Sequence, residues 1–144
     1  MKTAEIRSVV QQFIDWTKVK IQIHLSDKFV YFRDGEIWWA SIGVNIGHEE
    51  QGKNKNFERP IVVLKKFNRY VLWAIPLTTK TKIDNPYYYQ YRLYGKEYAA
   101  ILPQLKLISS KRLLRRISMF PSDDYEKIKE QIKKLLQKNE THSQ

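Results

Sequence analysis

The sequence contains no cysteine. This absence excludes a disulfide framework, a thiolate nucleophile and a zinc site built on cysteine ligands. The three histidines, His24, His48 and His142, are scattered singly, so we expect no catalytic metal and no bound cofactor. Glycine-rich patterns that cradle phosphates are also missing, which argues against nucleotide hydrolysis.

Long apolar runs are missing as well. No stretch of about 18 apolar residues occurs, and the first residues form a charged amphipathic segment without the apolar core of a signal peptide. We therefore expect neither a membrane span nor secretion. The expected location is the cytoplasm.

Acidic residues are few relative to basic ones. The 144 residues include 26 lysines and arginines against 15 acids, which gives a net charge of +11 at pH 7. A chain of this length, 42% hydrophobic, is expected to form one domain with a packed core. Its positive charge favours a polyanionic binding partner such as nucleic acid, although an acidic protein would be attracted by the same electrostatic field. Four tryptophans and nine tyrosines among the basic residues match the stacking faces that unpaired RNA bases require.

Helical periodicity occurs at both ends of the chain. Apolar residues recur at three- and four-residue steps from Thr3 to about Ile23 and predict a helix that packs against the body of the protein, with a dedicated partner-binding helix as the alternative. A second helix is expected after Ser122, which we assign as its N-cap. Its apolar face comprises Tyr125, Ile128, Ile132, Leu135 and Leu136. Residues 139–144 are expected to form a frayed polar tail.

Short β-rich runs separated by turn residues occupy the middle of the chain. They fall within residues 29–42, 61–67, 70–77, 87–93 and 98–108 and predict a mainly β fold, either a small barrel or a sandwich, with flanking helices. Trp38 and Trp39 alternate, so one is expected in the core and the other outside it. The polar stretch from Asn45 to Glu58 is long for a hairpin loop, and such loops are often functional.

Four segments in fixed order carry a resemblance to a known family. They are GEIWWASIGVNIGHEEQG at 35–52, ERPIVVLKKF at 58–67, WAIPLTTKTK at 73–82 and ILPQLKLISSKRLLRRI at 101–117. Together they resemble the PemK/MazF toxins of toxin–antitoxin systems. The hallmarks of that family include a G-x-E-Q loop, an R-P step into an aliphatic strand and a P-[LC]-T-[TS] strand end. The resemblance covers about residues 35–138.

This resemblance implies a fold and an activity. The fold would be a small SH3-like barrel, related to the plasmid-maintenance gyrase poisons, with residues 1–34 as an N-terminal helical extension and 35–138 as the barrel with its C-terminal helix. The activity would be metal-independent, sequence-specific endonucleolytic cleavage of single-stranded RNA, bound along the groove of a homodimer. A cognate antitoxin protein would neutralise it.

The resemblance also places the catalytic residues. The family's catalytic arginine falls on Arg59 and its threonine on Thr78, while the acid of the G-x-E-Q loop falls on Glu49, followed by Glu50 where the family usually has glutamine. A guanidinium fork can grip two phosphate oxygens, and a threonine hydroxyl can donate to the same phosphate. Glu49 either accepts the proton of the RNA 2′-hydroxyl or orients Arg59. Strand alternation predicts that only one of Thr78 and Thr79 lines the site.

Further RNA contacts are expected from polar side chains near the long loop, the strand end and the basic 101–117 segment. These are His48, Gln51, Lys53, Thr79, Lys80, Lys82 and Arg112. Two other functions remain open, namely a noncatalytic nucleic-acid-binding barrel and a gyrase-inhibitor-like toxin that binds a protein target. The presence of both Arg59 and Thr78 favours the enzyme.

Overall fold

The computed structural model describes residues 1–82 and 84–137. Helix α1 (Thr3–Leu25) leads into strands β1 (Glu36–Ser41), β2 (Glu58–Lys66), β3 (Val71–Thr78), β4 (Tyr88–Leu93) and β5 (Lys96–Ile101). After a short 3-10 turn (Leu102–Gln104) come β6 (Lys106–Ser109), a second 3-10 turn (Ser110–Arg112), β7 (Leu113–Met119) and helix α2 (Ser122–Leu136). The predicted tail at 139–144 lies outside the described residues.

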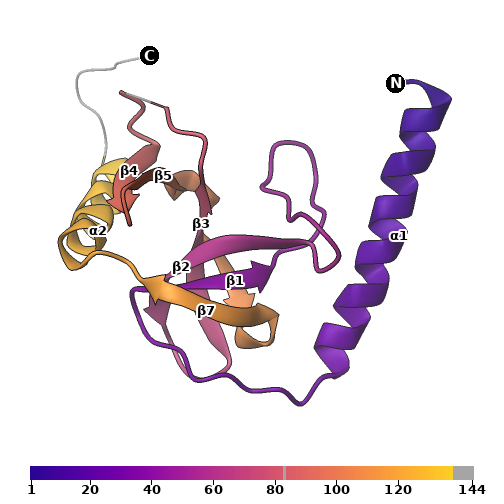
Figure 1. Ribbon diagram of the computed structural model, residues 1–144, viewed down its shortest axis with the longest axis horizontal. Coiled ribbons are helices and arrows are strands. Elements are labelled where there is room, and N and C mark those ends of the chain that lie inside the picture. Colours follow the sequence, from indigo (N-terminus) through magenta and orange to yellow (C-terminus); the bar gives the residue numbers. More distant parts are fainter. Residues whose placement is uncertain (83, 138–144) are drawn as a thin grey trace.

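Within the described residues the strands form one seven-stranded antiparallel sheet in the order β4-β5-β3-β2-β1-β7, with β6 paired to β3. Strand β3 pairs with β6 through residues 71–74 and with β5 through residues 77–78. Strand β3 thus changes its pairing partner along its length, from β6 to β5. The sheet bends into a small barrel beside the β4–β5 hairpin (Figure 1). The mainly β fold with flanking helices is therefore confirmed.

The sheet is buried on both faces, as alternation along β2 shows. Ile61 and Val63 belong to the cluster inside the barrel, together with Trp38, whereas Val62 and Leu64 face a second cluster. Helix α2 covers that second face with Ile128, which is fully buried. Trp38 is thus the core tryptophan and Trp39 is only partly buried, as alternation predicts.

Helix α2 differs from the prediction at its two ends. Pro121, not Ser122, is the N-cap, because the amide of Tyr125 donates to the Pro121 carbonyl at 2.9 Å and the helix begins one residue earlier than the serine cap requires. Leu136 is exposed and does not share the apolar face. The other face residues pack as predicted, and the Tyr125 hydroxyl donates to the Leu64 carbonyl at 2.7 Å.

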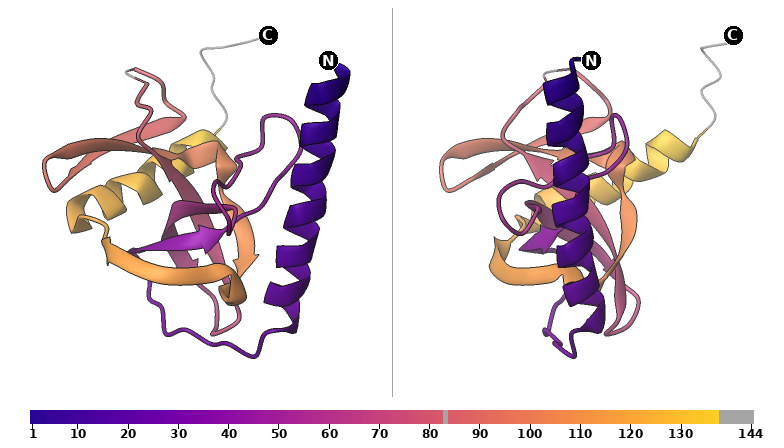
Figure 2. Two further views of the ribbon diagram at one scale, coloured as in Figure 1. Left: turned by 45° about the vertical axis from the view of Figure 1, so that its right-hand side comes forward. Right: turned by 90° about the vertical axis from the view of Figure 1, so that its right-hand side faces the viewer.

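Helix α1 forms as predicted, but its packing differs from the prediction. Only Trp16 is buried, while Ile6, Val10 and Ile21 remain 48%, 50% and 53% exposed. The helix stands beside the barrel rather than lying along it, so most of its apolar stripe has no neighbour in the described chain (Figure 2). Residues 29–33, expected to begin the β-rich part, contain no strand. Phe32 is nevertheless fully buried in the barrel core.

Strand β7 was not predicted, because two arginines interrupt its apolar pattern. Each arginine pairs with an acid: Arg115 Nη1 lies 2.9 Å from Glu58 Oε2, and Arg116 Nε lies 2.7 Å from Glu36 Oε2. Glu36 also accepts bonds from the Arg33 amide and the Trp38 indole. The strand lies at the sheet edge, where charged side chains are common.

The Glu36 site gives a prediction for the pH dependence of stability. Burial alone would raise the pKa of Glu36, but the hydrogen bonds from Arg116, Arg33 and Trp38 outweigh it and hold the pKa below its ordinary value of 4.5. The contribution of ionised Glu36 to the free energy of unfolding is therefore present above about pH 4.5. It is lost as the pH falls through the lower pKa of the folded state. We expect Glu36→Gln to cost about 1–3 kcal/mol at neutral pH and progressively less in acid.

Thermal unfolding of both proteins at pH 7 and at acidic pH measures this difference. Glu97→Gln is the matched control, because Glu97 forms an exposed pair with Arg92 and such pairs contribute little. A gap between wild type and Glu36→Gln that stays constant from pH 7 into acid would contradict the assignment.

Candidate active site

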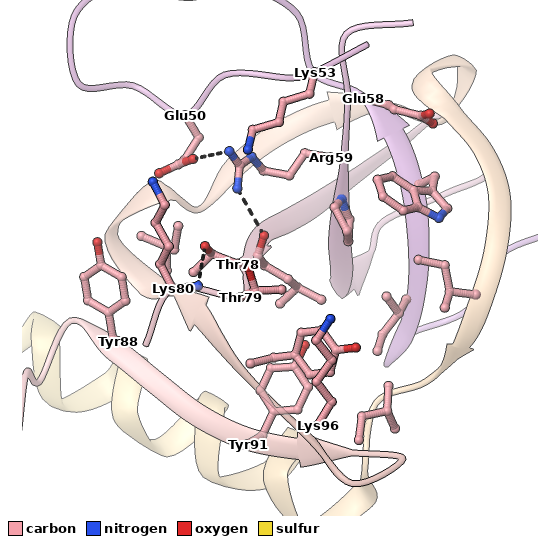
Figure 3. Close-up of a pocket in the computed structure, with 18 of the residues that line it drawn as sticks. Glu50, Lys53, Glu58, Arg59, Thr78, Thr79, Lys80, Tyr88, Tyr91 and Lys96 are labelled. Carbon is pink, nitrogen blue, oxygen red and sulfur yellow. Dashed lines mark hydrogen bonds and ion pairs between the residues drawn. The ribbon is translucent and has the colours of Figure 1, made fainter. Parts of the chain in front are cut away.

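A pocket of about 640 Å³ opens where the start of β2, the end of β3, the β1–β2 loop (residues 42–57) and the β4–β5 hairpin meet (Figure 3). The sheet brings these segments together because β2 pairs with β3 and β3 pairs with β5 at its end. The lining of the pocket combines cations with tyrosines from the β4–β5 hairpin. The basic lining residues are Lys53, Arg59, Lys80, Lys82 and Lys96.

Arg59 is held at one side of this pocket by three partners. Its Nη2 lies 3.0 Å from Glu50 Oε2, its Nε donates to the Gln51 carbonyl at 2.9 Å, and its Nη1 donates to the Leu77 carbonyl at 3.3 Å. The side chain is 15% exposed. A guanidinium has five N–H groups, so these contacts within residues 1–82 and 84–137 leave two for a ligand in the pocket.

Thr78 and Thr79 follow directly on the Leu77 carbonyl that binds Arg59. The Thr78 hydroxyl accepts a hydrogen bond from the Lys80 amide at 3.1 Å. Both threonines line the pocket. The prediction that only one would do so was wrong, because β3 ends at Thr78 and strand alternation does not extend to Thr79. The pocket therefore has two neighbouring hydroxyl groups beside one arginine.

The acid beside Arg59 is Glu50. Glu49, the residue expected there, is exposed outside the pocket, and its Oε1 accepts from the Ile46 amide at 3.0 Å. The adjacent pair Glu50-Gln51 is the sequence signal that could have identified it, because this pair supplies the E-Q of the loop motif after one inserted residue. Gln51 stabilises the loop: its side chain bonds both the amide and the carbonyl of Asn45.

The other expected RNA contacts separate into two groups. Lys53, Thr79, Lys80 and Lys82 line the pocket. His48 and Gln51 lie in the β1–β2 loop but are not among the residues that line the pocket. Arg112 is elsewhere, since its Nη1 donates to the Ser41 carbonyl at 3.1 Å and its guanidinium lies 5.7 Å from the Trp16 ring centroid. Burial lowers the pKa of Arg112.

The contribution of the β4–β5 hairpin to the pocket was not predicted from the sequence. Tyr88, Tyr91 and Lys96 line the pocket, and the Lys82 ammonium lies 5.2 Å from the Tyr88 ring centroid. Burial raises the pKa of Tyr91, with further contributions from Tyr98 and Asp124, so its phenol stays neutral. The cluster of tyrosines at residues 87–91 was the available signal. Strand alternation alone would have placed Tyr88 and Tyr91, three residues apart, on opposite faces, so only the folded chain shows that both line the pocket.

A metal-binding cluster and a membrane-spanning helix are both absent from the part of the chain that the structure describes. Nowhere in 1–82 or 84–137 do three or more histidine, cysteine, aspartate or glutamate side chains gather in a way that could hold a metal ion. Neither of the helices in these ranges is both long and apolar enough to cross a membrane.

Comparison with known proteins relates this fold to toxins. The family model described as the PemK-like, MazF-like toxin of type II toxin–antitoxin systems matches residues 33–136. The structure of MazF from Deinococcus radiodurans (form I) superposes with a TM-score of 0.57 at 19% identity, covering 74% of this chain and 98% of that one. A MazE–MazF structure from the same organism (form II) gives 0.58 at 22% identity, with 74% and 97% covered. Among curated proteins, none matches closely enough to count as a relative.

Proposed function

Because this chain belongs to the PemK-like, MazF-like toxins of type II toxin–antitoxin systems, we propose that it is an endoribonuclease that cuts single-stranded RNA without a metal ion. The observation that carries this proposal is Arg59, held with two free N–H groups beside Thr78 in a pocket whose lining includes four lysines. Such a site offers what a phosphodiester transition state needs, namely fixed donors and positive charge where negative charge develops.

The chemistry uses the nucleophile that RNA carries itself. The 2′-oxygen attacks the adjacent phosphorus and forms the 2′-O–P bond, while the P–O5′ bond breaks. Arg59 binds the nonbridging oxygens through its planar fork and stabilises their charge. Thr78 donates its hydroxyl to the same phosphate. A guanidinium has too high a pKa to serve as a base near neutral pH, so the role of Arg59 is electrostatic.

Glu50 has the position that we expected of Glu49. In the free enzyme it forms an ion pair with Arg59 and orients the guanidinium. The RNA phosphate binds the two remaining N–H groups of Arg59, which places the 2′-hydroxyl beside the Glu50 carboxylate. Glu50 then accepts the proton of the 2′-hydroxyl, and the departing 5′-oxygen takes a proton from water. One side chain thus acts first as a positioning group and then as a base.

The remaining pocket residues suit an unpaired strand. Lys53, Lys80, Lys82 and Lys96 place positive charge in the pocket lining, and Tyr88 offers a ring on which a base can stack. A duplex does not present free base faces, so single-stranded RNA fits this combination better.

Thr78 provides a direct test of this arrangement. We expect Thr78→Val to lower kcat by about tenfold, because one neutral hydrogen bond to the transition state is lost and Arg59 remains. Thr79→Val is the matched control, and its effect should fall on KM because Thr79 contacts the RNA without acting on the phosphate. Single-turnover cleavage of a short RNA measures both constants. A larger loss of kcat in Thr79→Val than in Thr78→Val would reverse the two roles.

We also propose that the protein is a cytoplasmic homodimer that a cognate antitoxin inhibits. Support comes from family membership and from the form II structure, which is described as MazE–MazF. Light scattering should give about twice the chain mass of 17.3 kDa for the toxin alone. A monomeric mass at the concentrations where RNA is cut would contradict the dimer.

A further inference from the structure

Helix α1 precedes the segment that matches the family model, and it contacts the β1–β2 loop, which carries Glu50. The match begins at residue 33, whereas α1 ends at Leu25. Figure 2 shows α1 alongside the β1–β2 loop. The one buried side chain of α1 is Trp16, which is 6% exposed. Val19 and Ile23 are half-buried, and Lys111 Nζ donates to the His24 carbonyl at 2.8 Å near the end of the helix. Trp16 is therefore the most deeply buried contact between α1 and the rest of the protein, but it is not the sole one.

Trp16 packs against both ends of the β1–β2 loop. At the first end lies Gly43, where an added Cβ would come within 2.2 Å of the indole and where φ is +88°, so both the contact and the backbone require glycine. At the other end lies Phe57, whose ring centroid is 5.6 Å from that of Trp16. The amides of Ile42 and Gly43 both donate to the Phe57 carbonyl, at 3.0 and 3.1 Å, which ties the two ends together.

Arg112 fixes the same indole from the barrel side. Its guanidinium lies 5.7 Å from the Trp16 ring centroid, and it donates to the Ser41 carbonyl at the end of β1. This arginine, expected to contact RNA, thus links α1 to the base of the loop.

The loop base connects directly to Arg59. The Gly52 amide donates to the Gly43 carbonyl at 2.8 Å, next to the Gln51 carbonyl that accepts from Arg59. The same loop carries Glu50, the ion-pair partner of Arg59. A displacement at Gly43 or Phe57 is therefore transmitted through one or two hydrogen bonds to the guanidinium.

We infer that α1 holds the β1–β2 loop in its active conformation and that Trp16 is a positioning residue for Arg59 and Glu50. The effect on cleavage rests on the proposed function, whereas the effect on the loop does not. Without the indole, Gly43 and Phe57 lose the surface that fixes them, and the loop opens more often. Misplacement of a catalytic group by a fraction of an ångström lowers the rate severalfold.

The test compares three full-length variants. Trp16→Ala removes the ring, Trp16→Phe keeps a smaller one, and Phe13→Ala is the matched control because Phe13 is an exposed aromatic residue on the same helix. Hydrogen exchange at the Ile42, Gly43 and Gly52 amides reports on the loop without requiring any activity. We expect exchange there to be about tenfold faster in Trp16→Ala, intermediate in Trp16→Phe and unchanged in Phe13→Ala, with strands β2 and β3 exchanging as in wild type.

Cleavage kinetics provide the second measurement. In Trp16→Ala kcat should fall about tenfold with a smaller change in KM, because the reacting groups are misplaced while the lysines that line the pocket remain in place. Loop amides that exchange at the wild-type rate, or a whole barrel that exchanges uniformly faster, would overturn the inference. Should Trp16→Ala fail to fold, Trp16→Phe against Phe13→Ala makes the same comparison. Absence of cleavage by wild type would refute the proposed function, while the exchange result would still decide the role of Trp16.

Discussion

Replacing Arg59 with alanine should lower RNA cleavage by at least about 10²-fold, because it removes a preorganised donor pair from the developing phosphorane. The loss should fall mainly on kcat, since the lysines that line the pocket still bind the RNA backbone. Arg59→Lys keeps the charge and loses the planar fork, so it should recover only a small part of the rate. Single-turnover rates at saturating RNA measure this effect.

A control is needed because Arg59 also stabilises the loop. Its bonds to the Gln51 and Leu77 carbonyls link the β1–β2 loop to β3. Thermal unfolding of Arg59→Ala should therefore show a cooperative transition at a somewhat lower temperature. Near wild-type cleavage by a folded Arg59→Ala protein would contradict the assignment of the catalytic arginine.

RNA binding should weaken by about 10²-fold when salt rises from about 50 to 200 mM. Single-stranded RNA loses affinity with a slope of about −0.7 per neutralised phosphate on a double-logarithmic plot. The five cations that line the pocket, if each contacts one phosphate, give a slope of about −3.5. Fluorescence anisotropy with a labelled RNA that carries 2′-methoxy groups measures this slope without cleavage.

Single lysine variants show which residues cause the salt dependence of RNA binding. Lys80→Gln should reduce the slope by about 0.7, because one pocket contact is lost. Lys133→Gln is the matched control, because Lys133 lies on α2 and pairs with Glu130 outside the pocket. A flat salt response in wild type, or equal changes in the two variants, would place the RNA on another surface.

The fold could be predicted largely from patterns that act locally. Helical spacing located α1 and α2, and short apolar runs located β1 to β5, because these periodicities decide which side chains can be buried together. Strand β7 was missed since Arg115 and Arg116 break its alternation. Their partners, Glu58 and Glu36, are 57 and 80 residues away in sequence, so only the folded chain reveals the pairing.

The residues that act on the phosphate could be predicted from the sequence, whereas several of the surrounding pocket residues could not. Arg59 and Thr78 were selected by motif, and the structure brings their segments together through the pairing of β2 with β3. Glu50 was passed over because one inserted residue shifts the loop motif. Lys96 lies on a different hairpin and belongs to no motif, so its place in the pocket follows only from tertiary structure. The apolar stripe of α1 likewise gave no reason to single out Trp16.

The most direct test of the account is RNA cleavage by the purified protein in excess EDTA, with the fragment ends identified. A reaction in which the 2′-oxygen attacks and the 5′-oxygen leaves must yield 2′,3′-cyclic phosphate and 5′-hydroxyl ends at recurrent positions. We predict these ends at undiminished rate in EDTA. Cleavage that EDTA abolishes, 5′-phosphate ends, or RNA that is bound and never cut would contradict metal-independent cleavage at Arg59.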